Sequence, residues 1–111
     1  MSWLLNLEIV SSPEDLERGL GGRTYLPEDA GMLFVLQPGD RSPFTMRGML
    51  IPIDFIWLSS RGEVVAIAAN VQPPENVQLL PQADFAYVLE TNAGFTERND
   101  VRPGDKIEIS Y

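Results

Sequence analysis

Residues 53–70, IDFIWLSSRGEVVAIAAN, decide the fold of this chain because they hold two strand-like runs around one tight turn. The runs IDFIWL and EVVAIAAN are rich in β-branched and aromatic side chains, which pack well on a pleated sheet. Between them, SSRG places Gly62 where a hairpin needs permissive backbone. The stretch therefore predicts an antiparallel hairpin, and one residue of its first strand, Asp54, is out of keeping with its apolar neighbours.

The sequence on either side of this hairpin predicts further short strands. Residues 3–10 alternate apolar and polar side chains, as a half-buried strand does. Residues 31–37 are apolar throughout, which is typical of a central strand covered on both sides. Residues 85–92 and the alternating tail 101–111 complete a set of about six strands.

Two short helices and two irregular segments connect these strands. Ser12 as N-cap, Pro13 at the first helical position and glycines from residue 19 onward predict a helix in residues 12–22. Residues 92–101 predict a second helix of one or two turns, capped by Asn92. The prolines and glycine of residues 43–50 indicate an irregular extended segment, and residues 70–82, with three prolines, indicate a long ordered loop.

These elements predict a single mainly β domain (α+β) over residues 1–111. The strands follow one another too closely for repeated strand–helix–strand crossovers, so we expect a mostly antiparallel sheet. Such a sheet would form a small barrel or a sandwich. Little room would remain for a deep cavity, so a ligand site would be a groove or a rim.

The composition excludes several classes of function. There is no Cys and no His, so disulfides, thiolate nucleophiles and the commonest zinc ligands are excluded. The net charge of −8, without a basic run, opposes binding to nucleic acid or to an anionic membrane. No signal peptide or transmembrane segment is indicated, which favours a cytoplasmic location by default. We expect no cofactor and no bound metal.

Four ordered motifs resemble a known family. They are GLGGRTYLPEDAGMLFVL, FTMRGMLIPIDFIWLSSRGEVVAI, YVLETNAGF and RPGDKI, and together they run from about Glu14 to Ile107. In this order they are similar to the small prokaryotic family named domain of unknown function 192. The resemblance implies a compact β-rich domain, and it leaves the activity open because the family has no established function.

This chain departs from the family pattern in its most distinctive segment. The family usually has a Trp followed by Met-Lys-Asn-Thr in this segment. This chain has Thr45 in place of the Trp, and it has Gly48 and Met49 in place of two of the polar side chains. Earlier, the family often has a Met where this chain has Gly21 or Gly22. If those positions form a polar site in the family, this chain carries an altered one.

Asp54 is the first candidate site residue, because a carboxylate in an apolar strand needs a partner. One interpretation is structural: Asp54 accepts hydrogen bonds from backbone amides of residues 46–50, or pairs with Arg47 or Arg23, and fixes that loop. A second is that Asp54 and Arg47 face a groove and orient a polar ligand. A third is a general acid or base with a shifted pKa.

Glu90 is the parallel case, at the end of the strand predicted in residues 85–92. Together with Asp54 it could form a two-carboxylate site for acid–base catalysis or for Mg²⁺ or Ca²⁺. Capping of the following helix is the structural alternative. Arg23 could belong to a loop-stabilising cluster with Glu28 and Asp29, or could hold an anion above a groove.

The sequence is most consistent with a non-catalytic binding module for a small polar molecule or a peptide. The candidate ligand-binding rim is Arg23, Met46, Arg47, Asp54 and Glu90. Met46, with Phe44 and Met49, would form an adaptable apolar patch if this segment were exposed. Two alternatives stay open: a carboxylate enzyme using Asp54 and Glu90, with or without a metal, and a structural or interaction protein. The oligomeric state is left undetermined.

Overall fold

The predicted hairpin is present in the computed structural model, which describes residues 5–73 and 78–108. β3 (Ile53–Leu58) and β4 (Val64–Val71) pair antiparallel. The Ser59 backbone carbonyl accepts a 2.9 Å bond from the Gly62 amide and closes the turn. Gly62 has a φ of +81°, and a Cβ there would lie 2.6 Å from the Ile107 carbonyl oxygen. The glycine is therefore required both by its left-handed backbone and by the close approach of the chain.

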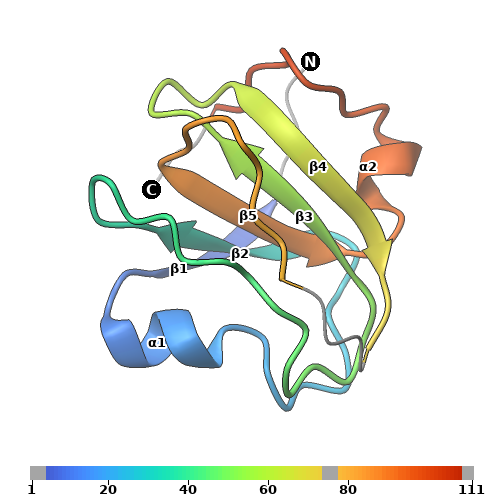
Figure 1. The fold of residues 1–111 in the computed structure, drawn as a ribbon. Coiled ribbons are helices and arrows are strands. Elements are labelled where there is room, and N and C mark those ends of the chain that lie inside the picture. Colours follow the sequence, from blue (N-terminus) through green and yellow to red (C-terminus); the bar gives the residue numbers. More distant parts are fainter. Residues whose placement is uncertain (1–4, 74–77, 109–111) are drawn as a thin grey trace.

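Five strands form one mixed sheet in the order β1-β2-β5-β3-β4 (Figure 1). The remaining elements are β1 (Asn6–Val10), α1 (Pro13–Arg18), β2 (Ala30–Val35), β5 (Tyr87–Asn92) and α2 (Phe95–Arg98). β1 and β2 are parallel and joined by a crossover that contains α1, whereas the other neighbours are antiparallel. β5, the last strand along the chain, lies in the middle of the sheet.

The predictions of about six strands and of a barrel or sandwich differ from this architecture. The described residues form five strands, and their sheet is open, with β1 and β4 at its edges. In the predicted final strand, Lys106 makes only an isolated bridge to Glu63. Residues 1–4 and 109–111 of the predicted end strands, and residues 74–77 of the predicted loop, lie outside the described residues.

α1 forms as its sequence predicts. The Ser12 hydroxyl accepts a 3.2 Å bond from the Asp15 amide, Pro13 occupies the first turn, and Gly19 ends the helix. The helix has no buried residue, but Leu16 packs partly against the sheet. α1 therefore covers one end of the sheet without closing over it.

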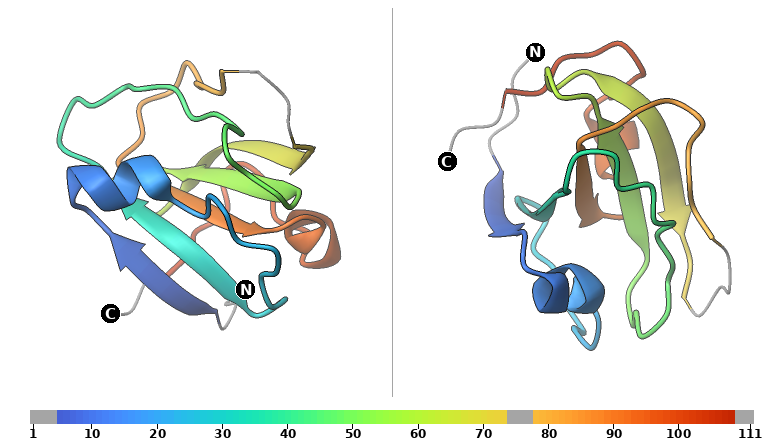
Figure 2. Two further views of the ribbon diagram at one scale, coloured as in Figure 1. Left: turned by 90° about the horizontal axis from the view of Figure 1, so that it is seen from below. Right: turned by 60° about the vertical axis from the view of Figure 1, so that its left-hand side comes forward.

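Each face of the sheet carries its own apolar core, and the two helices lie well apart in both views of Figure 2. The face that α1 covers, here called the α1 face, includes Leu20, Met32, Phe34, Phe55, Trp57 and Val88. The opposite face, here called the α2 face, includes Leu33, Ile56, Leu58, Leu89, Phe95 and Ile107. Neighbouring residues of a strand alternate between the two cores, as the pleat requires.

Residues 36–52 run across the α1 face and include the irregular segment predicted for residues 43–50. Met46 and Met49 are buried, so the conditional prediction of an exposed patch with Phe44 is not realised. Phe44 is half-buried and its backbone pairs with Leu79. Arg41 holds the segment to residues 81–85, because its guanidinium donates to two backbone carbonyl groups there and lies 5.6 Å from the centre of the Phe85 ring.

Among the described residues, no helix is long and apolar enough to cross a membrane.

Candidate functional site

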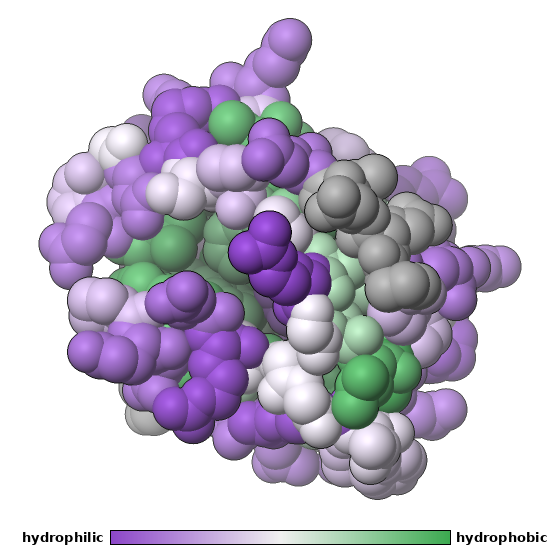
Figure 3. Space-filling model, turned by 60° about the horizontal axis from the view of Figure 1, so that its bottom comes forward, coloured by the Kyte–Doolittle hydropathy of each residue, from purple (hydrophilic) through white to green (hydrophobic). Residues whose placement is uncertain are grey.

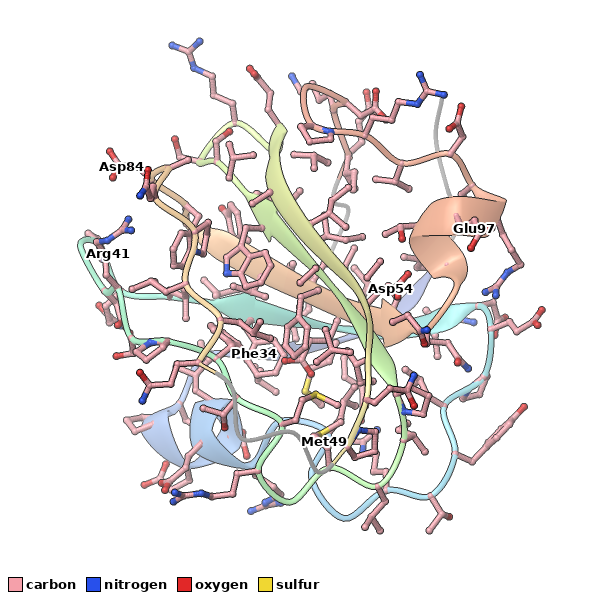
Figure 4. All side chains as sticks on the ribbon, turned by 45° about the vertical axis from the view of Figure 1, so that its right-hand side comes forward. Phe34, Arg41, Met49, Asp54, Asp84 and Glu97 are labelled. Atoms are coloured by element: carbon pink, nitrogen blue, oxygen red, sulfur yellow. The ribbon has the colours of Figure 1, made fainter. Side chains whose placement is uncertain are left out.

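Asp54 is fully buried and accepts four hydrogen bonds. One carboxylate oxygen accepts from the amides of Asn70 (2.7 Å) and Gly94 (3.2 Å). The other accepts from the amide (2.9 Å) and the hydroxyl (2.8 Å) of Thr96. Asp54 therefore ties β3 to the edge strand β4 and to the start of α2, beside which it lies in Figure 4.

This arrangement corrects two predictions about hydrogen bonding. The partners of Asp54 are backbone amides, but they come from β4 and α2 rather than from residues 46–50, and neither Arg47 nor Arg23 contributes a bond. Asn92 does not cap α2: the N-cap is Gly94, and the Asn92 side chain donates to the Leu26 carbonyl group. The cap is supplied by Asp54, which lies 40 residues or more away along the chain.

Glu90 lies on the other side of the sheet from Asp54. In the pairing of β3 with β5, Asp54 is opposite Thr91, and Phe55 is opposite Glu90. Directly paired residues share a face and successive residues alternate, so Asp54 points to the α2 face and Glu90 to the α1 face. The two carboxyl groups cannot work as a pair on one substrate or metal ion.

Glu90 is buried and has no partner among the residues that the structure describes. Its residue is 5 % exposed, and Met32 and Phe55 flank it on the neighbouring strands. Its carboxyl group makes no hydrogen bond or ion pair with any other residue that the structure describes. Burial alone raises the pKa of Glu90 to about 8. The side chain is therefore neutral at pH 7 in most molecules.

A pocket of about 540 Å³ opens over Glu90. It lies between α1 and residues 36–49, on the α1 face of the sheet. Its apolar walls are Leu16, Leu20, Phe34, Leu36, Phe44 and Met49. Figure 3 shows an apolar recess ringed by hydrophilic side chains on this side of the molecule, and Figure 4 shows Phe34 and Met49 away from Asp54. The sequence predicted a groove or a rim rather than a deep cavity, and this pocket is open to solvent at its mouth.

The rim of the pocket carries both signs of charge. Glu17 and Arg18 come from α1, and Asp40 and Arg47 come from the segment that crosses the sheet. Arg47, Arg18 and Glu17 are exposed, and Asp40 is half-buried. The charges at the mouth therefore balance, and among the described lining residues the buried ionisable group is Glu90.

The five residues of the predicted rim do not form one site. Arg47 and Glu90 line the same pocket. Met46 is fully buried in the core of the α1 face, and Asp54 lies on the α2 face. Arg23 pairs with Glu8 of β1, not with Glu28 or Asp29.

Phe44 and Met49 were named in the predicted apolar patch, but the other apolar walls of the pocket were missing from the predicted site. Phe34 and Leu36 were recognised only as strand residues, and Leu16 only as part of a helix. The fold brings α1 and Glu90 of β5, about 70 residues apart in sequence, to the same pocket. The one local signal was Glu90 itself, a charged residue inside an apolar strand.

No group of three or more acidic side chains is placed to hold a metal ion within residues 5–73 and 78–108. Glu90 has no second carboxylate beside it on the pocket floor, since its strand neighbours are Met32 and Phe55. The chemistry that these residues offer is therefore that of one buried carboxyl group: it can accept or donate a proton, or hold one polar group of a bound molecule.

Two crystal structures share this fold. A protein of unknown function from Novosphingobium aromaticivorans DSM 12444 is 34 % identical, with a TM-score of 0.89 over 95 % of this chain and 75 % of that one. A protein from Sinorhizobium meliloti 1021, described as a "putative transcription regulator", is 34 % identical, with a TM-score of 0.84 over 92 % of this chain and 79 % of that one. Among curated proteins, none matches this chain significantly.

The family resemblance carried by the four motifs is also confirmed. The model of DUF192, described as "Uncharacterized ACR", matches residues 3–109. That match spans the sheet, both helices and every residue that lines the pocket. The chain belongs to the DUF192 family.

Proposed function

We propose that this domain is a non-catalytic binding module that holds a small organic molecule in the pocket between α1 and residues 36–49, with Glu90 as its polar anchor. A pocket of this size suits a small molecule better than a peptide strand. Arg47 at the mouth would orient the exposed end of the ligand.

The observation that carries the proposal is the unpartnered carboxyl group of Glu90 at the bottom of an apolar pocket. The Glu90 residue is buried, its carboxyl group borders the pocket, and it has no hydrogen-bond partner among the described residues. Asp54, buried in the same sheet, accepts four hydrogen bonds. This fold can therefore give a buried carboxylate a full set of donors when the residue has a structural role. Glu90 instead faces a space that a ligand can enter, and this supports a binding role.

The test is a fragment screen read by methyl NMR of the methionines. Met49 lines the pocket, while Met32 and Met46 belong to the buried core and report on the fold. We expect some fragments to shift the Met49 signal saturably, and the Leu16→Trp substitution to abolish the shift by filling the pocket.

Ile9→Trp is the matched control, because Ile9 is 43 % exposed and does not line the pocket. It should leave fragment binding unchanged. The proposal fails if no fragment of a diverse set shifts Met49 at millimolar concentration, or if Leu16→Trp binds fragments as the unmodified protein does.

If the domain is an enzyme instead of a binding module, Glu90 is its candidate acid–base residue. A carboxyl group whose pKa is raised to about 8 can exchange a proton near neutral pH, and this favours a general acid or base in the pocket. The predicted pair with Asp54 is no longer part of it, because the two residues face opposite sides of the sheet. Turnover of a bound fragment, lost in Glu90→Gln, would favour this alternative over simple binding.

The description of the Sinorhizobium meliloti protein does not lead us to propose nucleic-acid binding for this chain. Affinity for nucleic acid depends on clustered Lys and Arg. This chain has 8 basic against 16 acidic residues, and the two Arg side chains at the pocket mouth are balanced by Glu17 and Asp40.

A further inference from the structure

We infer that the ligand of this pocket is an organic cation, an ammonium or amidinium group on an apolar or aromatic body, whose charged head binds the Glu90 carboxylate. This inference rests on the proposed function and names its ligand class. Three features of the pocket support it: the chemistry of its floor, the aromatic walls and the distribution of charge.

The floor of the pocket determines which head group can be buried there. A purely apolar ligand would offer no hydrogen bond to the Glu90 carboxyl group, which has no protein partner among the described residues. An anion would face that carboxyl group without a cation beside it, since Met32 and Phe55 flank Glu90. A cationic donor lets Glu90 ionise and forms charge-assisted hydrogen bonds, which are about twice as strong as neutral ones.

The walls suit the same head group. Phe34 and Phe44 line the pocket and meet edge to face, with ring centroids 5.2 Å apart and an interplanar angle of 85°. Aromatic faces attract cations through their quadrupole, and more strongly where water is excluded. Leu16, Leu20 and Met49 provide the surface for an apolar body.

The charge distribution also favours a cation at the floor. The charged groups around the pocket are Glu17 and Arg18 from α1 and Asp40 and Arg47 from residues 36–49, and they balance at the mouth. The flanking strands add no charge beside Glu90. A net charge of −8 on the whole chain attracts cations over longer distances.

Binding of a cation is therefore coupled to loss of a proton. The carboxyl proton of Glu90 leaves to buffer, and the ammonium group of the ligand takes its place as the hydrogen-bond donor. No other bond is made or broken. Because the proton is still bound to Glu90 near neutral pH, its release is measurable there.

Three probes with one aromatic body test the inference: 1-naphthylmethylamine (cationic), 1-naphthalenemethanol (neutral) and 1-naphthoate (anionic). Titration calorimetry at pH 7 should show the amine binding at least tenfold more tightly than the other two. In buffers of different ionisation enthalpy, its measured heat should change in the direction of proton release.

Glu90→Gln should remove both the tenfold preference and the proton release, while the neutral probe keeps its affinity. Glu97→Gln makes the same substitution on the exposed side of α2, away from the pocket, and should alter neither. A ¹H–¹⁵N spectrum and melting curve check that Glu90→Gln is folded. If that variant does not fold, Leu16→Trp, which leaves Glu90 in place, must abolish binding of the amine.

The outcomes separate this inference from the proposed function. If the alcohol or the carboxylate shifts the Met49 methyl signal and binds as tightly as the amine, the pocket binds ligands but the cation assignment is wrong. If none of the three probes shifts Met49 at millimolar concentration and the wider fragment screen also fails, the pocket is not a binding site and both proposals fall.

Discussion

Asp54 of β3 pairs with Thr91 of the neighbouring strand β5, and Glu90 is the residue before Thr91. The carboxyl groups of Asp54 and Glu90 therefore face opposite sides of one sheet. Asp54 has four donors and serves the fold, whereas Glu90 has none among the described residues and faces a pocket. Both acids lie in apolar strands of the sequence. Because the pleat directs them to opposite faces, Asp54 has a structural role and Glu90 is a candidate binding residue.

Asp54→Ala should destabilise the protein strongly. It removes the acceptor of three backbone amides and one hydroxyl, from Asn70, Gly94 and Thr96. We expect a loss of about 3–5 kcal/mol in the free energy of unfolding, measured in urea, because several buried donors are left unsatisfied. Thr96→Val, which removes only the hydroxyl donor, should cost about 1 kcal/mol. Equal losses in the two variants would contradict the proposed capping role.

Glu90→Gln should change how stability depends on pH. The pKa of Glu90 is about 8 in the folded chain and 4.5 ordinarily, so the folded state binds the extra proton between these values. Stability is then full below pH 4.5 and is lost as the pH rises through 8. At pH 8 we expect Glu90→Gln to be more stable than the unmodified protein by on the order of 4 kcal/mol.

At pH 4 the same comparison should show little difference, because both folded and unfolded Glu90 are then largely protonated. Melting curves at the two pH values provide the measurement, with Glu97→Gln as the control for removal of one acidic residue. A pH-independent difference between Glu90→Gln and the unmodified protein would show that Glu90 is not desolvated.

Arg23→Gln should have a small effect. The Arg23–Glu8 pair is exposed, with 39 % and 54 % of the two side chains accessible, and exposed pairs contribute less than about 1 kcal/mol. Arg23 lowers the pKa of Glu8, so this contribution is present at neutral pH and is lost as the pH falls through the lowered pKa. Urea unfolding should show a small cost at pH 7 that becomes smaller as the pH falls below the ordinary Glu value of 4.5. A loss of several kcal/mol at pH 7 would mean that Arg23 has a further role.

Gly62→Ala and Gly39→Ala separate two reasons for glycine. Both residues have a φ of +81°, but a Cβ at Gly62 would lie 2.6 Å from the Ile107 carbonyl oxygen, whereas nothing lies within 4 Å at Gly39. Gly39→Ala should cost about 1 kcal/mol for its backbone conformation. Gly62→Ala should cost about 2 kcal/mol more, because the backbone must also move. Equal unfolding free energies for the two variants would show that the approach to Ile107 is not tight.

The local parts of the fold were predictable from the sequence. The hairpin of β3 and β4 follows from two strand-forming runs around Gly62, and α1 follows from Ser12, Pro13 and the glycine that ends it. The buried run in β2 correctly indicated a central strand. These features depend on residues close together in the chain, where spacing alone is informative.

The non-local parts were not predictable in the same way. Nothing in the sequence indicates that β5 inserts between β2 and β3, or that β1 pairs parallel to β2. The cap of α2 was sought at Asn92, its nearest polar neighbour, but a buried carboxylate from β3 supplies it. Sequence reasoning identified Asp54 and Glu90 as unusual, and only the strand register shows that they face opposite sides.

A carbon-detected NMR titration of the Glu90 carboxyl group in the free protein addresses directly whether this side chain is an unpaired acid at the floor of the pocket. Glu90→Gln identifies the signal by its absence. The structure predicts a midpoint at about pH 8, since the carboxyl group is buried and has no partner among the described residues. A midpoint near the ordinary value of 4.5 would mean that Glu90 is solvated or paired, and it would contradict its assignment as the anchor of a binding pocket.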